Sequence, residues 1–497
     1  MKILEKILNV SQTREADNHT ILKEEISSFA LMGQASLAFV KAIEPLLQRS
    51  QKIAIVGGVG NNGGDGFAIA RILRNKKYNI QPFLVQFKET LTPDCIINYE
   101  KLHDTIVINS TSEIPDFFEY DVIIDGIFGF GLSRPITGFT KQVIENINKA
   151  KKTVYAVDVP SGLYCDTLPD SETIVQADTV VSFQRPKLSF FFPENGNYVK
   201  NWKTVDIGLD ENFIQQQKSN FFILNEKITE ILTPRLRQSH KGSYGHALLI
   251  AGSYGKMGAA VLSSKACLRS GTGLLTTYVP KCGYQIIQSS IPEAMCLTDE
   301  NEEFVTQLQL PEISKYDVVG IGPGLDTNEK TAQVVKKLLS ESKNPLVIDA
   351  DAINIIAQNE ELKSLLPKNS ILTPHIKEFD RLVGKSDTST ERFQKQLEFS
   401  AKYQCVVVLK NAYTTISSPE GNLYFNTSGN QGMATGGSGD VLTGIITGLL
   451  AQNYSSLHAA LLGVYFHGKA GDEAASKKGY NALIASDIID ALRIEKH

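Results

Sequence analysis

The chain has 497 residues, of which 42% are hydrophobic and 21% charged, and this length and composition predict a globular protein with two domains. Its 50 basic and 54 acidic side chains give a net charge of −4, and no long basic block indicates a nucleic-acid surface. Charged residues interrupt the first apolar stretch, and no apolar run reaches the roughly 18 residues of a membrane span. We therefore expect a cytoplasmic protein that binds neither nucleic acid nor a membrane.

The six cysteines are scattered, with no CxxC spacing and no nearby pair of histidines. This distribution disfavours both a zinc site and a disulfide framework.

Apolar runs that alternate with helical patterns predict the fold class. An amphipathic helix is expected within residues 24–47, and the first half then shows strand-like runs at 52–58, 81–87, 121–129, 153–162 and 177–183. The second half repeats the style at 246–253, 273–280, 317–325, 345–354, 370–375 and 405–410. Short buried strands separated by helices predict mostly parallel α/β sheets with helices on both faces. Residues 206–227 interrupt the rhythm with polar side chains, so we expect a linker there and domains at 1–217 and 218–497.

The first glycine-rich turn, "KIAIVGGVGNNGGDGFAIARIL", contains the spacing G-x-G-x-x-G after a predicted strand. A dinucleotide-binding fingerprint also needs an acidic residue about 20 positions on, at the end of the next strand. That strand ends in Gln86 and Phe87, which disfavours an ordinary NAD-dehydrogenase domain. Asn61, Asn62 and Asp65 still make the turn polar and suited to an anionic ligand at a helix start. The alternative is that they only form the turn and cap the helix.

Two further predicted strands end in polar residues, Asp125 in the first and Asp158 with Ser161 in the second. Ligands of open α/β sheets bind at the carboxyl ends of the strands. A carboxylate at the end of an apolar strand needs a partner, which could be a group of N–H donors, a cation or the substrate. A purely structural role for either aspartate is the alternative.

The second glycine-rich turn, "NQGMATGGSGDVLTG", leads into an apolar helix. Its backbone N–H groups and the helix dipole predict an anion-binding hollow, suited to phosphate, although the turn lacks the Walker sequence. Asp440 stands at this helix start and could accept a proton from a substrate hydroxyl. Alternatively, Asp440 is simply an N-cap. Neighbouring strand ends contribute Gly324, Asp349, His375 and Lys410 to a candidate binding cleft.

In combination, these motifs resemble a known family over nearly the whole chain. Through "GNNGGDG", "DGIFGFGLSRP" and "VDVPSGL" the first half is similar to NAD(P)H-hydrate epimerase domains, which have a Rossmann-like three-layer α/β/α fold. Through "GSYGKMGAA", "GPGL", "DADAIN", "LTPH" and "GMATGGSGDVLTG" the second half resembles ADP-dependent NAD(P)H-hydrate dehydratases of the ribokinase-like α/β class.

The resemblance implies that hydrated NADH or NADPH is the substrate. The first domain would interconvert the R and S hydrates, and the second would dehydrate the S form at the expense of ADP, with Mg²⁺ accompanying the nucleotide. Asp158 and Asp440 would be the catalytic residues, and we expect a homo-oligomer. Potassium at the first site would be bound by Asn62, Asp125 and Ser161, which offer hard oxygen donors.

The binding residues that the resemblance implies fall into two groups. Those of the first domain are Asn61, Asn62, Gly63, Gly64, Asp65, Gly129, Phe130, Gly131, Leu132, Ser133, Arg134 and Pro135. Those of the second domain are Ala259, Gly324 and His375 for the hydrate and Lys410, Asn411, Ala412, Tyr413, Thr414 and Gly439 for the adenine nucleotide. The family usually reads Lys-Gly-Ala-x-Thr at the nucleotide strand, whereas this chain has Asn411 in place of the glycine.

Two other interpretations remain open at the level of sequence. The second glycine turn with Asp440 would also suit a ribokinase-like kinase of a small alcohol, since phosphoryl transfer needs the same anion-binding hollow and base. The first half could instead be a non-catalytic binding module.

Overall fold

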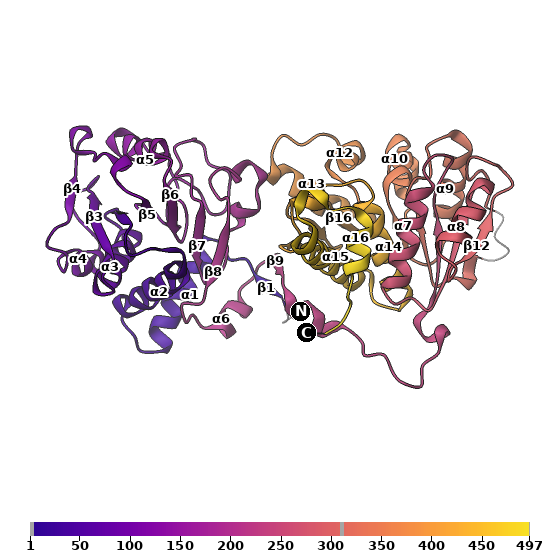
Figure 1. Cartoon of the computed structure of the whole chain (residues 1–497), viewed down its shortest axis with the longest axis horizontal. Coiled ribbons are helices and arrows are strands. Elements are labelled where there is room, and N and C mark those ends of the chain that lie inside the picture. The colour runs from indigo at the N-terminus through magenta and orange to yellow at the C-terminus, as the bar shows by residue number, and fades with distance from the viewer. Residues whose placement is uncertain (1–3, 309–312, 497) are drawn as a thin grey trace. The chain divides into compact units, whose positions relative to one another are not determined.

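The computed structural model describes residues 4–308 and 313–496 (Figure 1). The chain forms two compact units. One spans Lys6–Ser219, and the other combines Leu4 and Glu5 with the chain from Asn220 onward. The expected linker at 206–227 also contains regular structure, because helix α6 (Glu211–Gln216) and strand β9 (Phe221–Leu224) lie within it.

The first unit is built on one parallel sheet. In the described residues the strand order is β4-β3-β2-β5-β6-β7-β8, and every paired neighbour is parallel. The order in which successive strands are added to the sheet reverses between β2 and β5, so the carboxyl ends of these two strands form the switch point at which doubly wound folds bind ligands. The strands are β2 (Lys52–Gly57), β3 (Asn79–Val85), β4 (Ile106–Ile108), β5 (Val122–Gly126), β6 (Thr153–Val157), β7 (Thr179–Phe183) and β8 (Trp202–Val205). The helices are α1 (Val10–Lys23), α2 (Ser28–Ile43), α3 (Asn61–Asn75), α4 (Pro93–Tyr99), α5 (Gly138–Ala150) and α6.

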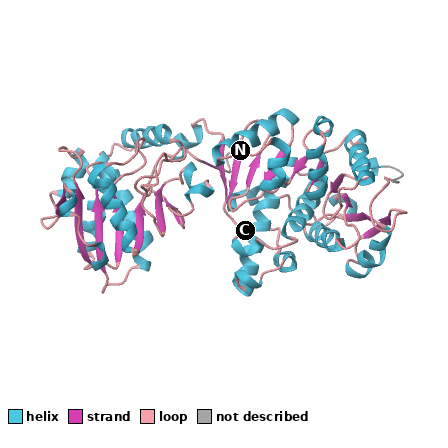
Figure 2. Cartoon of the chain, turned by 90° about the horizontal axis from the view of Figure 1, so that it is seen from above, coloured by secondary structure: helices cyan, strands magenta, loops and turns pink. Residues whose placement is uncertain are grey.

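Alternate side chains of the central strands bury both faces of this sheet. Ile53 and Ile55 of β2 pack with residues of α2 and α3, whereas Ala54 and Val56 pack with residues of α5. Successive side chains of a strand point to opposite faces, so a run that is apolar throughout fits a sheet covered on both sides. The expected three-layer α/β/α architecture is confirmed, and Figure 2 shows the strands between helices.

The second unit contains a larger mixed sheet, whose order in the described residues is β1-β9-β18-β17-β16-β15-β14-β13-β10-β11-β12. The pairs from β12 to β16 are parallel, while β17 runs antiparallel to both β16 and β18. The strands are β1 (Glu5–Lys6), β9, β10 (His246–Ile250), β11 (Leu274–Val279), β12 (Met295–Thr298), β13 (Val318–Ile321), β14 (Leu346–Ile348), β15 (Ile371–Leu372), β16 (Val406–Leu409), β17 (Thr415–Ser417) and β18 (Leu423–Asn426). The helices are α7 (Met257–Arg269), α8 (Tyr284–Ser290), α9 (Glu329–Glu341), α10 (Ala350–Gln358), α11 (Glu360–Ser364), α12 (Ile376–Val383), α13 (Ser389–Tyr403), α14 (Ser438–Ala451), α15 (Ser456–Lys478) and α16 (Ala485–Ala491).

Two apolar clusters cover the faces of this second sheet. One contains residues of α7, α14, α15 and α16, and the other contains residues of α9, α10, α12 and α13. Leu4, near the start of the chain, is 1% exposed and belongs to the first of these clusters. The α/β fold of the second half is therefore confirmed, and its core includes a residue from the opposite end of the sequence.

In the described part of the chain no single helix is long and apolar enough to cross a membrane. The bent pair Val10–Lys23 and Ser28–Leu46 reaches that length and composition only when taken together.

Candidate active sites

The first glycine turn is shaped by close backbone approach. A Cβ atom on Gly63 would lie 1.9 Å from the carbonyl oxygen of Gly58, and one on Gly58 would lie 2.1 Å from that of Ile127. Only glycine fits at these two positions, and the turn thereby packs against the end of β5. Helix α3 begins at Asn61 with Gly60 as its N-cap and no side-chain cap hydrogen bond. The asparagines and Asp65 therefore do not cap this helix.

Asp125 lies at the switch point, fully buried at the end of β5. Its Oδ1 accepts hydrogen bonds from the Ser161 hydroxyl at 2.6 Å and the Ile127 N–H at 3.2 Å, and its Oδ2 accepts one from the Ser161 N–H at 2.8 Å. Burial raises the pKa of Asp125 to about 6, although these hydrogen bonds offset part of the rise. The partner that we expected for this carboxylate is thus a set of N–H and O–H donors.

Two of the three residues predicted to bind potassium, Asn62 and Ser161, meet at one backbone carbonyl, and the third, Asp125, accepts the Ser161 hydroxyl. The Asn62 carboxamide donates to the carbonyl oxygen of Phe128 at 2.9 Å, and the Ser161 hydroxyl lies 3.3 Å from the same oxygen. Carboxylate, hydroxyl, carboxamide and carbonyl oxygens are hard ligands of the kind that a weakly charged cation prefers. The donor set therefore fits potassium in chemistry.

A cavity of about 420 Å³ opens beside this cluster. Arg14 of α1 lines the cavity, with its guanidinium 5.9 Å from the ring centre of Phe130, and Lys88 adds a second cation that the sequence had not indicated. Gly63, Gly64 and Pro135 do not line it, and neither do the buried Asp125 and Ser161. Of the predicted residues, the cavity gathers Asn61, Asn62, Asp65, Gly129, Phe130, Gly131, Leu132, Ser133, Arg134 and Asp158.

Asp158 has a left-handed backbone conformation, with φ of 63°, directly after β6. This conformation is uncommon for a residue other than glycine and is typical of functional sites. The side chain is nearly buried, and its Oδ1 lies 2.8 Å from the Lys187 ammonium. The partner expected for this carboxylate is therefore a lysine that the sequence had not singled out.

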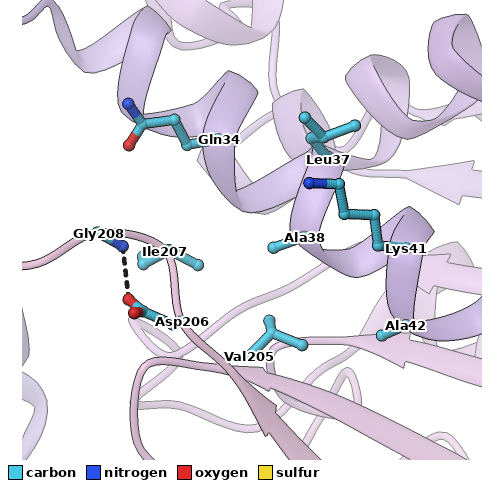
Figure 3. Close-up of a pocket in the computed structure, with 9 residues that line it drawn as sticks. All are labelled: Gln34, Leu37, Ala38, Lys41, Ala42, Val205, Asp206, Ile207 and Gly208. Atoms are coloured by element: carbon cyan, nitrogen blue, oxygen red, sulfur yellow. Dashed lines mark hydrogen bonds between the residues drawn. The ribbon is translucent and has the colours of Figure 1, made fainter.

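A second hollow in the first unit, of about 570 Å³, lies between α2 and the segment after β8 (Figure 3). Its lining contains Lys41 and Asp206 but none of the predicted site residues. The Asp206 carboxylate accepts the Gly208 N–H at 2.8 Å, which closes a local turn.

In the second unit, α14 starts at Ser438 after the glycine turn. Gly437 is the N-cap with φ of 90°, so the turn requires a glycine there. Asp440 is the third residue of the helix, and no side-chain cap hydrogen bond is formed. The N-cap interpretation of Asp440 is therefore wrong. The first N–H groups of α14 remain available to an anion.

The carboxyl group of Asp440 has a pKa close to physiological pH. Burial raises the pKa of Asp440 to about 7, the charge of Asp349 adds to the rise, and the Lys410 ammonium opposes it. In the described chain, no protein group forms a hydrogen bond with the Asp440 carboxylate. A half-buried carboxyl with this pKa can accept a proton from a substrate near pH 7.

Lys410 is held next to the glycine turn by Asp349. The Lys410 ammonium lies 2.9 Å from Oδ1 of Asp349, whose Oδ2 accepts the Thr443 hydroxyl at 2.7 Å. Burial alone would lower the pKa of Lys410, but the Asp349 and Glu378 carboxylates outweigh it and raise that pKa. A Cβ atom on Gly439 would lie 3.2 Å from the Lys410 ammonium, so the predicted nucleotide residues Lys410 and Gly439 are neighbours.

The predicted hydrate-binding residues lie on adjacent connections. A Cβ atom on Gly324 would lie 3.0 Å from that of Ala259 on α7, so these two backbones are close. His375 caps α12, because its Nδ1 accepts the Glu378 N–H at 3.2 Å, yet its side chain is 49% exposed. The backbones of His375 and Lys410 form an isolated parallel β-bridge, which places both residues at the ends of neighbouring strands. Asn411, Ala412, Tyr413 and Thr414 form the following loop, where the Asn411 carboxamide accepts the Ala412 N–H at 2.8 Å.

A buried histidine that the sequence had not indicated also supports this turn. The Nε2 atom of His467, on α15, lies 3.3 Å from the Ser438 hydroxyl at the start of α14. Burial lowers the pKa of His467 to about 4, so the ring is neutral at physiological pH.

Comparisons with known proteins match a separate family model to each half of the chain. Residues 28–189 match a family model described as YjeF-related protein N-terminus, and residues 247–493 match one described as NAD(P)H-hydrate dehydratase. A ribokinase-like superfamily protein from Enterococcus faecalis V583 has a solved structure that is 33% identical, with a TM-score of 0.50, over 56% of this chain and 95% of that chain. The second unit is thus ribokinase-like.

Full-length relatives carry both halves. A bifunctional NAD(P)H-hydrate repair enzyme of Moorella thermoacetica is 37% identical over 94% of this chain and 92% of its own length. The corresponding enzyme of Coxiella burnetii is 34% identical over 97% of this chain and 98% of its own length. The chain belongs to the family of bifunctional NAD(P)H-hydrate repair enzymes.

Proposed function

We propose that the protein repairs hydrated nicotinamide nucleotides. The first site interconverts the R and S hydrates of NADH and NADPH. The second converts the S hydrate and ADP into the reduced nucleotide, AMP and phosphate. Family membership over both halves supports this assignment. The observation that carries it is the arrangement around Asp440, a carboxyl without a hydrogen-bonding partner in the described residues and with a pKa of about 7, at a helix start that suits phosphate.

In the second site we assign the proton transfer to Asp440. Its carboxylate takes the proton from the ring hydroxyl of the S hydrate while that oxygen attacks the β-phosphorus of ADP. The bond from that phosphorus to the bridging oxygen breaks, and AMP leaves. The phosphate ester then departs from the ring carbon as inorganic phosphate, the adjacent carbon loses a proton, and the ring double bond is restored.

The surrounding residues would bind and orient the reactants. The N–H groups at Gly439 and the start of α14 would hold the transferring phosphate, and Lys410 with the loop Asn411–Thr414 would hold the adenine nucleotide. Ala259, Gly324 and His375 would contact the hydrate. We expect Mg²⁺ to enter with ADP, because this ion is bound largely through nucleotide phosphates and water.

In the first site we assign the central role to Asp158, which lines the cavity together with the glycine turn and residues 129–134. Pro135, Gly63 and Gly64 would shape this wall from outside the lining. Asn62, Asp125 and Ser161 would hold potassium, and a potassium ion there would place one positive charge beside the anionic substrate.

We further propose that residues 1–217 and 218–497 act as separable functional domains, that the protein works in the cytoplasm and that it forms a homo-oligomer. Each unit has its own sheet and core, which supports separability. A soluble fragment of residues 1–217 that equilibrates the hydrates would support the division, and an insoluble one would count against it. Light scattering on the purified chain tests the oligomer.

The decisive test of function is recovery of reduced-nicotinamide absorbance. Purified protein is mixed with hydrated NADH in the presence of ADP, of ATP or of neither. We expect recovery with a nucleotide and none without it. No recovery in any mixture would contradict the proposal, and a stable phosphorylated product would favour a kinase instead.

A further inference from the structure

Lys187 is a buried lysine to which none of the predicted roles applies. It is 3% exposed and lies shortly after β7, and its ammonium is 2.8 Å from Oδ1 of Asp158. When only side-chain atoms are counted, Lys187 and Asp158 are each 4% exposed. Asp158 lines the cavity of the first site, whereas Lys187 does not. The lysine can therefore act on the substrate only through Asp158.

The contacts of Asp158 are distributed unevenly over its two oxygens. Besides the ammonium, Oδ1 accepts the Phe183 N–H at 2.8 Å and the Ser182 hydroxyl at 3.1 Å. Within the described residues, no hydrogen bond to Oδ2 is formed. One oxygen is thus fixed by three donors, and the other remains able to accept a proton.

The ionisable groups around Lys187 are mostly acidic. Asp17, on α1, lies close to Lys187, and Asp65, on α3, lies close to Asp158. Cys165 and Asp166, a few residues after Asp158 in the chain, also lie near the lysine. Burial raises the pKa of Asp17 to about 7 even though Lys187 lowers it, and burial together with the charge of Asp158 raises the pKa of Asp65 well above its ordinary value. Asp17 therefore exchanges a proton near neutrality.

The nearby arginine does not substitute for this lysine. The Arg185 guanidinium pairs with Glu211, whose Oε1 lies 2.6 Å from it. Lys187 instead makes its further contacts with backbone, 3.3 Å from the Arg185 carbonyl oxygen. Burying an ammonium and a carboxylate is costly unless both are well bonded, and this pair meets that condition on both sides.

We propose that Lys187 is a positioning residue of the first site, which keeps Asp158 a carboxylate and leaves its Oδ2 free for the substrate. This inference rests on the proposed epimerase function. Without the ammonium, a nearly buried carboxyl group binds a proton instead of carrying an unpaired charge. Asp158 would then be unable to accept a proton from the hydrate until the pH is raised.

The test is the pH dependence of R-to-S conversion by Lys187→Gln in the full chain, with the uncatalysed rate subtracted. We expect kcat at pH 7 to fall roughly 10²-fold, KM to change only a few-fold, and the rate to recover as the pH is raised. Lys187→Arg keeps the charge and should restore most of the rate at pH 7. Lys200→Gln is the matched control, because Lys200 pairs with Asp178 at the same 2.8 Å distance but on the surface, and its profile should equal that of the wild type.

Melting curves of the same samples report whether each variant is folded, and their dehydration rates report the second site alone. If the wild type converts no hydrate, the proposed function itself fails. If the wild type converts the hydrates and Lys187→Gln does so equally at every pH, only the role of Lys187 is overturned. A loss that neither high pH nor Lys187→Arg relieves would also overturn it, since it would show a merely structural lysine. Should Lys187→Gln fail to fold, Lys187→Arg still decides, because a 10²-fold loss in a folded Lys187→Arg contradicts the proposal.

Discussion

The two sites hold their central aspartates in opposite ways. Asp158 is nearly buried, and one of its oxygens is fixed by three donors, one of which is the Lys187 ammonium. Asp440 forms no hydrogen bond with any described residue, and the nearby Lys410 forms its ion pair with Asp349 instead. The first aspartate is prepared before the substrate arrives, whereas the second has a pKa of about 7 and depends on what binds beside it. This difference suits a site for one substrate and a site where a nucleotide and a hydrate must meet.

The largest expected effect concerns the backbone of the first turn. A methyl group on Gly63 would meet the Gly58 carbonyl, so Gly63→Ala should displace the turn and abolish hydrate interconversion while dehydration continues. Gly33→Ala, on α2, is the matched control, because its Cβ would have no neighbour within 4 Å and Gly33 does not line the cavity. Chromatography of R and S hydrates checks both variants. Normal interconversion by Gly63→Ala would separate this turn from the reaction.

Potassium should distinguish the sites next. Replacing it by a large organic cation should slow R-to-S conversion about tenfold or more and leave dehydration unchanged, since the Asn62, Asp125 and Ser161 oxygens belong to the first unit. Initial rates in the two salts at equal ionic strength measure the effect. Equal slowing of both reactions would remove the ion from the first site.

The pKa of Asp440 predicts a smaller, graded effect. Dehydration needs its carboxylate, so kcat should fall about tenfold for each pH unit below about 7. A rate that stays flat between pH 5.5 and pH 8 would contradict this role of Asp440.

The same shift affects stability. The folded-state pKa lies above the ordinary value of 3.8, so between about pH 4 and pH 7 the folded chain holds a proton that the unfolded chain has lost. Stability therefore decreases as the pH rises through that window. Melting curves of the wild type and Asp440→Asn should diverge there, with the variant the more stable at pH 8.

The sequence predicted the sheets and the strand-end polar residues because both follow local rules. Buried parallel strands are apolar throughout, and ligands bind at their carboxyl ends, so Asp125, Asp158 and Ser161 could be assigned to one edge of the sheet from their positions. The grouping of Asn62, Asp125 and Ser161 as potassium ligands came from the family resemblance. Strand β9, which lies in the expected linker, was not predicted. Its partner β18 is about two hundred residues away in the sequence, and no local pattern shows such a pairing.

The residues that sequence reasoning missed depend on tertiary contacts. Lys187 lies 29 residues after Asp158, and the two meet because β6 and β7 are neighbours in the sheet. One signal in the sequence could have indicated the pair: Lys187 closely follows a buried strand, and Asp158 follows the buried strand before it. Arg14 reaches the cavity from α1, outside the matched range of residues 28–189, and Leu4, near the start of the sequence, belongs to the core of the second unit. No spacing within the sequence predicts either contact.

The smallest expected effect is at Asn411, where the family usually has glycine. The Asn411 side chain accepts its neighbour's N–H and lies on an exposed loop, so Asn411→Gly should change the KM for ADP only a few-fold and leave kcat unchanged. Initial rates against ADP concentration check this. A loss of kcat would show that Asn411 contributes to the chemistry itself.

The central claim is that two aspartates serve two separate reactions, and one time course of R hydrate, S hydrate and reduced nucleotide tests it in Asp158→Asn and Asp440→Asn. Asparagine preserves size but cannot accept the proton, so each variant should lose its own reaction by roughly 10² to 10⁴-fold with the fold intact. Asp440→Asn should equilibrate the hydrates and restore no reduced nucleotide. Asp158→Asn should consume the S hydrate and then stall. Near-normal recovery of reduced nucleotide by Asp440→Asn, in protein whose melting curve shows an intact fold, would contradict the account.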